Sequence, residues 1–168
     1  MGHSLVQSEP GEGSSFTLYL PASRSEKPFR NDRVIDYRAG TGHILVLDDK
    51  EYILEILKDM IEAMGYEAIL TEKSSEAFRI VQEDYRTDGR IKACILDQTL
   101  PGDLYGHEVA RKIHEIAPDL PLIASSGYVE SDVMINPGQY HFSACIAKPF
   151  DSQKLSEILH SNITEPGA

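Results

Sequence analysis

The chain has 168 residues, and its 27 acidic and 16 basic side chains give a formal net charge of −11 at pH 7. This is one domain of ordinary size with some chain left over, and a balance this acidic, without a Lys and Arg cluster, leads us to expect no nucleic-acid partner. No apolar run approaches the roughly 20 residues that cross a bilayer, so we expect no membrane contact by this piece and a cytoplasmic location.

Residues 1–42 differ in composition from the rest, because their five basic and five acidic side chains cancel. Two apolar stretches, 5–8 and 15–20, flank turn-forming residues 9–13, and Phe16, Leu18 and Leu20 alternate along the second stretch. This pattern predicts a strand, a loop and a strand. A lone hairpin is marginal in water, so it must lean on another surface or belong to a larger sheet. Residues 22–42 lack an apolar period and are predicted to be a linker.

From His43 onward, short apolar runs alternate with segments of helical periodicity. The apolar runs predict strands at 43–47, 68–70, 91–96, 121–124 and 144–147. The helical spacings predict helices from about 53 to 64, where Gly65 stops the first, at about 74–85 and 106–116, after Glu130, and at about 152–161. Strict alternation predicts an α/β fold with a parallel sheet covered by helices on both faces, which suits strands that are apolar at every position.

Polar residues follow four of the predicted strands. Asp48 and Asp49 follow the first strand, Asp97 the third, Ser125, Ser126 and Gly127 the fourth, and Lys148 the fifth. The carboxyl ends of parallel strands meet at one edge of an open sheet, where such sheets bind ligands. Clustered carboxylates repel one another unless a cation neutralises them, and oxygen ligands suit Mg²⁺ that shares a phosphate oxygen. The pattern therefore predicts a site for a divalent metal and a phosphoryl group.

Each of these residues alone has an ordinary structural explanation. Asp48 or Asp49 could cap the helix that begins near Lys50, Asp97 could cap a turn, Ser126 could belong to a plain loop, and Lys148 could be solvated. Only their joint placement carries the functional interpretation. The two cysteines, Cys94 and Cys145, lie within apolar runs and are expected to be reduced thiols packed in the core.

Residues 43 to about 161 resemble the receiver domain of two-component response regulators. The resemblance is carried by Asp48-Asp49, by residues 95–101 with Gly106 beyond them, by Ser126-Gly127-Tyr128 and by Lys148-Pro149-Phe150. It implies a doubly wound, flavodoxin-like, five-stranded parallel sheet in the order 2-1-3-4-5. Two positions depart from the family pattern. Cys145 stands where an aromatic residue is usual, and Asn136-Pro137-Gly138 should break or shorten the fourth helix.

The resemblance also implies the role of each site residue. Asp97 is the phosphoacceptor, and Asp48 and Asp49 hold Mg²⁺ together with Asp97 and the backbone carbonyl of Thr99. Ser126 supplies a hydroxyl and Lys148 an ammonium to the phosphoryl group, which also meets a backbone N–H near Gly127. A cis peptide bond is expected before Pro149. These roles agree with the chemistry of phosphoryl transfer, in which cations and N–H donors neutralise charge on the phosphoryl oxygens.

Residues 5–21 resemble the closing strand pair of a histidine kinase ATP-binding domain. The expected organisation is a kinase remnant over 1–21, a linker over 22–42, a receiver over 43–163 and a tail over 164–168. This order is that of a hybrid sensor histidine kinase. The resemblance implies that such a kinase is the parent protein of this piece, and a parent of this kind can be anchored in a membrane. The nucleotide-binding Asn and Gly-rich lid are missing, so this piece should not be a kinase by itself.

The sequence thus predicts a phosphorelay receiver that takes phosphate from a phosphohistidine. Its expected partners are the histidine kinase dimerisation and phosphotransfer domain and a downstream His phosphotransfer protein, and a weak homodimer is also compatible with the pattern. The alternative is a pseudo-receiver that binds proteins without being phosphorylated, for which Cys145 is the only support in the sequence. An aspartyl-phosphate hydrolase is disfavoured, because no general acid stands two residues after Asp97.

Overall fold

The computed structural model describes residues 2–22, 40–87, 89–100 and 104–163. The described residues belong to two separate units, an N-terminal hairpin and an α/β domain that contains residues 40–163. Most of the predicted linker and all of the predicted 164–168 tail lie outside the described residues. No helix within the described ranges is long and apolar enough to cross a membrane.

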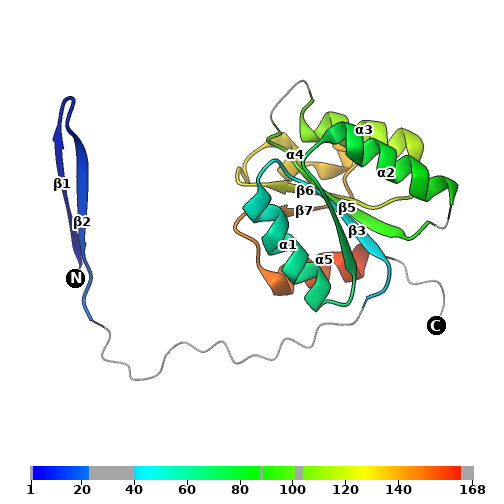
Figure 1. Ribbon diagram of the computed structural model, residues 1–168, viewed down its shortest axis with the longest axis horizontal. Coiled ribbons are helices and arrows are strands. Elements are labelled where there is room, and N and C mark those ends of the chain that lie inside the picture. Colours follow the sequence, from blue (N-terminus) through cyan, green and yellow to red (C-terminus); the bar gives the residue numbers. More distant parts are fainter. Residues whose placement is uncertain (1, 23–39, 88, 101–103, 164–168) are drawn as a thin grey trace. The chain divides into compact units, whose positions relative to one another are not determined.

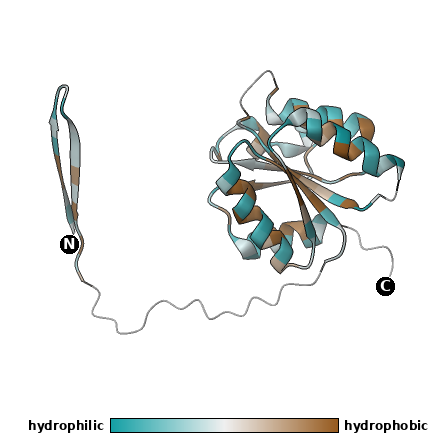
Figure 2. Cartoon of the chain, viewed as in Figure 1, coloured by the Kyte–Doolittle hydropathy of each residue, from teal (hydrophilic) through white to brown (hydrophobic). Residues whose placement is uncertain are grey.

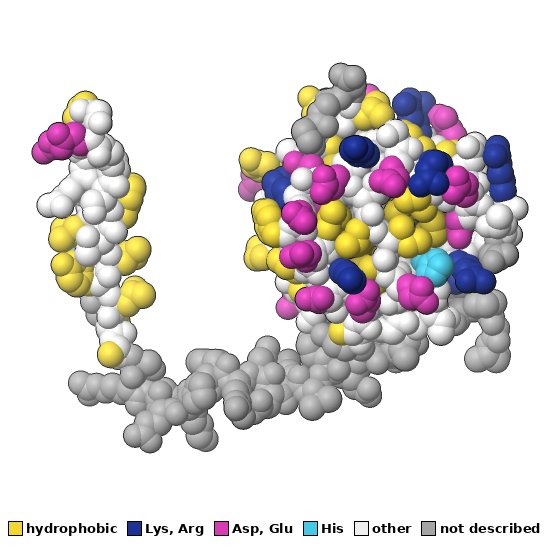
Figure 3. Space-filling model, in the orientation of Figure 1, with side chains coloured by type: hydrophobic (Ala, Val, Ile, Leu, Met, Phe, Trp, Pro, Cys, Tyr) yellow, Lys and Arg dark blue, Asp and Glu magenta, His cyan; other side chains and the backbone are white. Residues whose placement is uncertain are grey.

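The hairpin consists of strands β1 (His3–Glu9) and β2 (Gly13–Tyr19), which pair antiparallel with Val6 opposite Phe16. The turn between them has positive φ angles at Gly11 and Gly13, which glycine adopts without steric cost. This confirms the predicted strand, loop and strand. Every residue of both strands is exposed, and Figure 3 shows hydrophobic side chains along the hairpin surface.

The α/β domain contains a parallel sheet of five strands in the order β4-β3-β5-β6-β7. When the five strands are counted within the sheet, this is the predicted order 2-1-3-4-5. The strands are β3 (His43–Leu47), β4 (Glu67–Thr71), β5 (Ile91–Asp97), β6 (Leu122–Ser126) and β7 (Ala144–Ala147). The predicted fold class is therefore confirmed.

Helices cover both faces of the sheet, as Figure 1 shows: α2 and α3 on one face and α1 and α5 on the other. The helices are α1 (Glu51–Ala63), α2 (Ser74–Arg86), α3 (Gly106–Ile116), α4 (Asp132–Ile135), the 3₁₀ helix η1 (Pro137–Tyr140) and α5 (Ser152–Asn162). Gly65, with φ of 86°, follows the C-cap of α1 and ends it as the sequence predicts.

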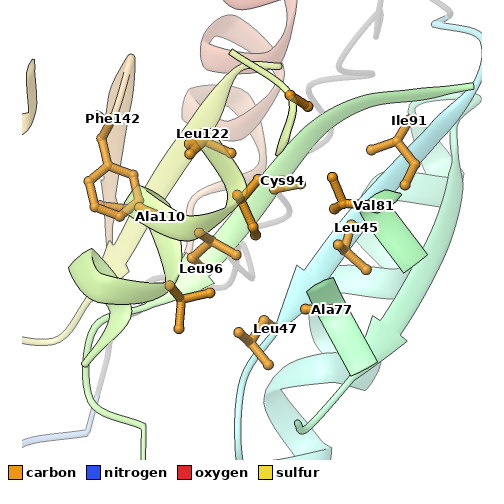
Figure 4. Close-up of a cluster of buried hydrophobic side chains, with 14 of the residues drawn as sticks. Leu45, Leu47, Ala77, Val81, Ile91, Cys94, Leu96, Ala110, Leu122 and Phe142 are labelled. Atoms are coloured by element: carbon orange, nitrogen blue, oxygen red, sulfur yellow. The ribbon is translucent and has the colours of Figure 1, made fainter. Parts of the chain in front are cut away.

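The strands are apolar at successive positions because each face of the sheet has its own core. Leu45 and Leu47 point into a core with α2 and α3, where Figure 4 shows them near Ala77, Val81 and Leu96. Ile44 and Val46 point the other way, into a core with α1 and α5. Figure 2 shows hydrophobic residues concentrated in the central strands and hydrophilic residues on the outer sides of the helices.

The fourth helix is short, as the sequence predicts. α4 has four residues, and Asn136 follows it with a φ of −128° and a ψ of 59°, outside the helical region. Pro137 then begins η1, where a missing N–H is tolerated. His141 follows η1 in the left-handed conformation with φ of 64°. The chain on this side of the sheet is thus a pair of short helical turns.

Candidate functional site

The carboxyl ends of β3, β5, β6 and β7 bring all the predicted side-chain site residues to one edge of the sheet. Asp97 is the last residue of β5, and its strand partner is Ser125 on β6. The backbone N–H of Lys148, just past β7, donates to the carbonyl of Ser126 at 2.8 Å. The residues gathered here are Asp48, Asp49, Asp97, Ser126 and Lys148.

Three carboxylates form the centre of the site. One ligand oxygen from each of Asp48, Asp49 and Asp97 lies within 4.8 Å of the others. Asp48 and Asp97 are only 1% and 2% exposed, whereas the Asp49 side chain is 24% exposed. Like charges this close and this deeply buried need a counter-charge.

Lys148 supplies that counter-charge to the two buried carboxylates. Its Nζ donates to Asp48 Oδ2 at 2.5 Å and to Asp97 Oδ1 at 2.9 Å. Burial raises the pKa of Asp48 and the Asp97 charge adds to this rise, while the hydrogen bond from Lys148 opposes it. The peptide bond between Lys148 and Pro149 is cis, in agreement with the expectation. The lysine is therefore part of the buried site and is not a solvated surface group.

The donor set fits a hard divalent cation. Asp97 Oδ2 is buried and has no hydrogen-bond partner among the described residues, although it lies in a cluster with two more carboxylates. A cation at this point would satisfy that oxygen, and carboxylate oxygens are the ligands that Mg²⁺ prefers. Thr99 lies two residues beyond Asp97 and is exposed. Its backbone carbonyl stays a predicted fourth protein ligand.

Ser126 stands at the end of β6 and is buried. Its Oγ accepts a hydrogen bond from the backbone N–H of Tyr128 at 3.0 Å, which fixes the turn that follows the strand. Gly127 is exposed, and a Cβ built there would meet no atom within 4 Å. Tyr128 is 74% exposed. The hydroxyl and the backbone next to it are thus held at the same edge as the carboxylates.

Lys50 belongs to this site as well, although from the sequence it is only the start of a helix. Its Nζ donates to Asp49 Oδ1 at 2.9 Å, and its backbone N–H donates to Asp48 Oδ1 at 3.1 Å. The hydrogen bond with Asp49 raises the pKa of Lys50. Its position directly after two aspartates was visible in the sequence, but side chains adjacent in a chain usually diverge.

Gly106 is a second residue whose role only the structure explains. A Cβ at this position would lie 2.2 Å from the carbonyl oxygen of Asp97 and 2.6 Å from the Gln98 side chain. Gly106 begins α3, so the first turn of this helix packs closely against the end of β5. The glycine therefore permits the close approach of backbone that positions Asp97.

The two cysteines are free, as predicted, but they differ in burial. Cys94 is fully buried, and burial raises the pKa of its thiol. Cys145 on β7 is only partly buried, and its thiol donates to the carbonyl oxygen of Met134 in α4 at 3.4 Å. Burial raises the pKa of Cys145 too, which disfavours the thiolate form in both cysteines.

Comparison with known proteins places this site in context. The sequence pattern of the response regulator receiver domain matches residues 44–160. The chain is 29% identical over 126 residues to the phosphate regulon transcriptional regulatory protein PhoB of Pseudomonas aeruginosa, an alignment that covers 74% of this chain and 52% of PhoB.

Two sensor kinases match over a longer stretch. Sensor histidine kinase AtsR of Burkholderia thailandensis is 29% identical over 167 residues, which covers 94% of this chain and 26% of AtsR. Sensor kinase CckA of Brucella abortus is 24% identical over 166 residues, which covers 92% of this chain and 17% of CckA. The chain therefore spans about half or less of the length of these relatives.

Solved structures of the same fold include a response regulator receiver domain protein from Clostridium thermocellum. It has a TM-score of 0.65 and 29% identity, and the match covers 73% of this chain and 94% of that one. The receiver domain of sensor histidine kinase PA1611 from Pseudomonas aeruginosa has a TM-score of 0.62 and 25% identity, over 73% of this chain and 97% of its own. The latter structure is described with a magnesium ion coordinated in its active-site cleft.

Proposed function

The chain belongs to the response regulator receiver domain family, and from this premise we propose that Asp97 is the residue that accepts a phosphoryl group. The domain is homologous to the phosphoacceptor domains of two-component signalling systems, and the pseudo-receiver alternative is not favoured. The observation that carries the proposal is the buried Asp97 carboxylate: Lys148 donates to one oxygen, and the other has no hydrogen-bond partner among the described residues and lies beside two further carboxylates.

Asp97 acts as the nucleophile in this proposal. A carboxylate oxygen forms the new O–P bond while the N–P bond of a phosphohistidine breaks, and the electron pair of that bond returns to the imidazole, which takes up a proton. Receiver domains bind Mg²⁺ in the active site. Asp48, Asp49, Asp97 and the Thr99 carbonyl would hold the ion here, where it would neutralise charge on the phosphoryl oxygens.

Once the phosphoryl group is on Asp97, its oxygens are bound by donors from three residues, Lys148, Ser126 and Gly127. The Lys148 ammonium already contacts Asp97, so a phosphoryl group on Asp97 comes within reach of the same Nζ. Ser126 then offers its hydroxyl and Gly127 its backbone N–H to the remaining oxygens. Donors fixed before the reaction stabilise the developing charge without a cost for reorganisation.

We infer that the parent protein is a hybrid sensor histidine kinase and that the hairpin is the closing strand pair of its ATP-binding domain. The supporting observation is the length of the sensor kinase alignments. An alignment that covers 94% of the 168 residues leaves only about ten unmatched, so it must include most of residues 1–43. The PhoB alignment covers 74% of the chain. The proposed division is thus kinase remnant, linker, receiver and tail at 1–21, 22–42, 43–163 and 164–168, with residues 40 and 42 at the end of the linker hydrogen-bonded to the receiver.

The partners follow from this organisation. Receiver domains interact with histidine kinases or phosphotransfer partners. For this chain we propose the phosphohistidine of a kinase dimerisation and phosphotransfer domain as donor, and a His phosphotransfer protein as acceptor. Transfer between them needs a phosphoaspartate that persists until the next histidine arrives.

The test is phosphorylation by a small-molecule donor. Acetyl phosphate with Mg²⁺ should give one hydroxylamine-sensitive phosphoryl group per wild-type chain, and Asp97→Asn should lose it, because an amide is a poor nucleophile. Asp119→Asn, which changes an aspartate outside the carboxylate cluster, is the control and should label like wild type. Removal of Mg²⁺ with a chelator should abolish labelling. Persistent label on the Asp97→Asn chain, measured by intact mass, would overturn the assignment.

A further inference from the structure

Among the residues that the structure describes, the site contains two lysines as well as three carboxylates, and each lysine has its own partners. Lys148 contacts Asp48 and Asp97, and Lys50 contacts Asp49. All three carboxylates of the cluster therefore have an ammonium partner before any metal binds. With the aspartates ionised, these five side chains carry a net charge of about −1, because two ammonium groups offset three carboxylates.

The contact between Lys50 and Asp49 falls on the most accessible carboxylate of the cluster. The Lys50 Nζ to Asp49 Oδ1 distance is 2.9 Å, and the two side chains are 41% and 24% exposed. Asp48 and Asp97 are closed off from solvent, so a cation that enters from outside meets Asp49 first. That entry position is occupied by an ammonium group.

A divalent ion and the Lys50 ammonium weaken each other's interaction with the Asp49 carboxylate. A bound cation would lie within a few ångströms of the same carboxylate, and two positive charges at that separation repel one another. The Lys50 side chain is long and more than one-third exposed, so it can leave Asp49 for solvent without burying an unpaired charge.

We propose that Lys50 is an internal competitor for Mg²⁺ at Asp49, so that its release from this carboxylate accompanies metal binding and lowers the metal affinity of the receiver. This inference rests on the proposed function, because it concerns the same metal site. It assigns Lys50 a positioning role and no contact with the reacting phosphorus. The partial exposure of the pair keeps the effect modest, roughly two- to fivefold in the dissociation constant at low salt.

The experiment is a Mg²⁺ titration of the full chain without any phosphodonor, followed by heteronuclear NMR of the Asp97 amide and the Lys50 side-chain Nζ. Lys50→Met removes the charge and keeps the length of the side chain, and Lys50→Arg keeps the charge. Lys58→Met is the matched control, because Lys58 is an exposed lysine two turns further along α1 and carries the same charge change.

Lys50→Met should bind Mg²⁺ about two- to fivefold more tightly than wild type, and the gain should shrink as salt is raised. Lys50→Arg and Lys58→Met should stay close to wild type. In the wild-type chain, the Lys50 Nζ signal should shift with the same midpoint as the Asp97 amide.

Equal affinities for wild type and Lys50→Met, or an Nζ signal that stays still while Asp97 titrates, would overturn the competition and leave the proposed metal site intact. An equal gain in Lys58→Met would also overturn it, since only the overall charge would then matter. Absence of Mg²⁺ binding by every variant would instead overturn the proposed metal site and the competition with it.

Discussion

Single residues of this domain show how a buried charge can be tolerated. Asp48 and Asp97 are almost fully closed off from solvent, and both depend on the Lys148 ammonium. Burial of a charged pair contributes little net stability, whereas removal of one partner leaves the other charge buried without compensation. Lys148 therefore has a structural role in the metal-free domain in addition to its proposed role toward the phosphoryl group.

Lys148→Met should destabilise the metal-free chain by about 3 kcal/mol or more, because two carboxylates then share one buried site without a cation. Urea unfolding measures this loss. Saturating Mg²⁺ should return part of it, since the ion would replace the missing positive charge and binds only the folded chain. Lys50→Met, which alters the half-exposed pair, should change stability much less. A Lys148→Met chain as stable as wild type would contradict this account.

Residue-level patterns predicted which side chains meet but not how they pair. Asp48 and Lys148 directly follow apolar strands and Asp97 ends one, so their convergence follows from parallel topology alone. The sequence places Lys148 and a metal at this edge, but it does not indicate that Lys50 also contacts a carboxylate of the cluster, as the structure shows. A side-chain contact such as Lys50 to Asp49 depends on rotamers and local backbone angles, which no periodicity encodes.

The helices and strands of the α/β domain agree closely with the prediction where the sequence pattern is long. Continuous apolar runs predicted β3 and β5, because a strand covered on both faces must be apolar on both. The short fourth helix was also predicted, since Pro137 cannot continue it. The close contact between the start of α3 and the end of β5 was not predictable. It occurs at Gly106 and involves backbone atoms, which carry no sequence pattern of their own.

Gly106→Ala tests this contact between elements. The added methyl group would meet the Asp97 carbonyl at 2.2 Å, so α3 or the end of β5 must shift, and the cost should be about 1–3 kcal/mol despite the better helix propensity of alanine. Urea unfolding should show this loss, and labelling by acetyl phosphate should slow because Asp97 moves. Gly138→Ala is the matched control: no atom lies within 4 Å of its added Cβ, so it should stay within about 0.5 kcal/mol of wild type.

At the scale of the whole molecule, the hairpin and the α/β domain differ in how they can be stable. The domain closes both of its cores with its own helices, and all members of both cores come from residue 44 onward. Within the described residues the hairpin has two strands, and Phe16 and Leu20 are 72% and 79% exposed. Two strands alone are marginal in water, so this hairpin needs another surface or further strands to be stable.

The edge of the α/β domain lies slightly before the predicted boundary at residue 43. Gly40 is buried against the Tyr66 ring, where a Cβ would come within 1.8 Å of the ring, and its N–H donates to the Met64 carbonyl at 2.9 Å. The N–H of Glu67 donates to the Gly42 carbonyl at 2.9 Å. Residues 40–42 therefore continue the hydrogen bonding of the sheet and the helix end. Composition alone could not assign them, because glycine and threonine are also common in linkers.

Two truncations separate these roles. A chain that begins at residue 40 should keep the urea midpoint of the full chain and its Asp97 labelling, because no core residue is lost. A chain that begins at residue 43 loses the Gly40 hydrogen bond and uncovers the Tyr66 ring, so it should be less stable by about 1–2 kcal/mol. Equal stability of the two truncated chains would show that residues 40–42 are linker. A loss of stability already in the chain that begins at residue 40 would show that the hairpin or the residues after it support the receiver, and would contradict its independence.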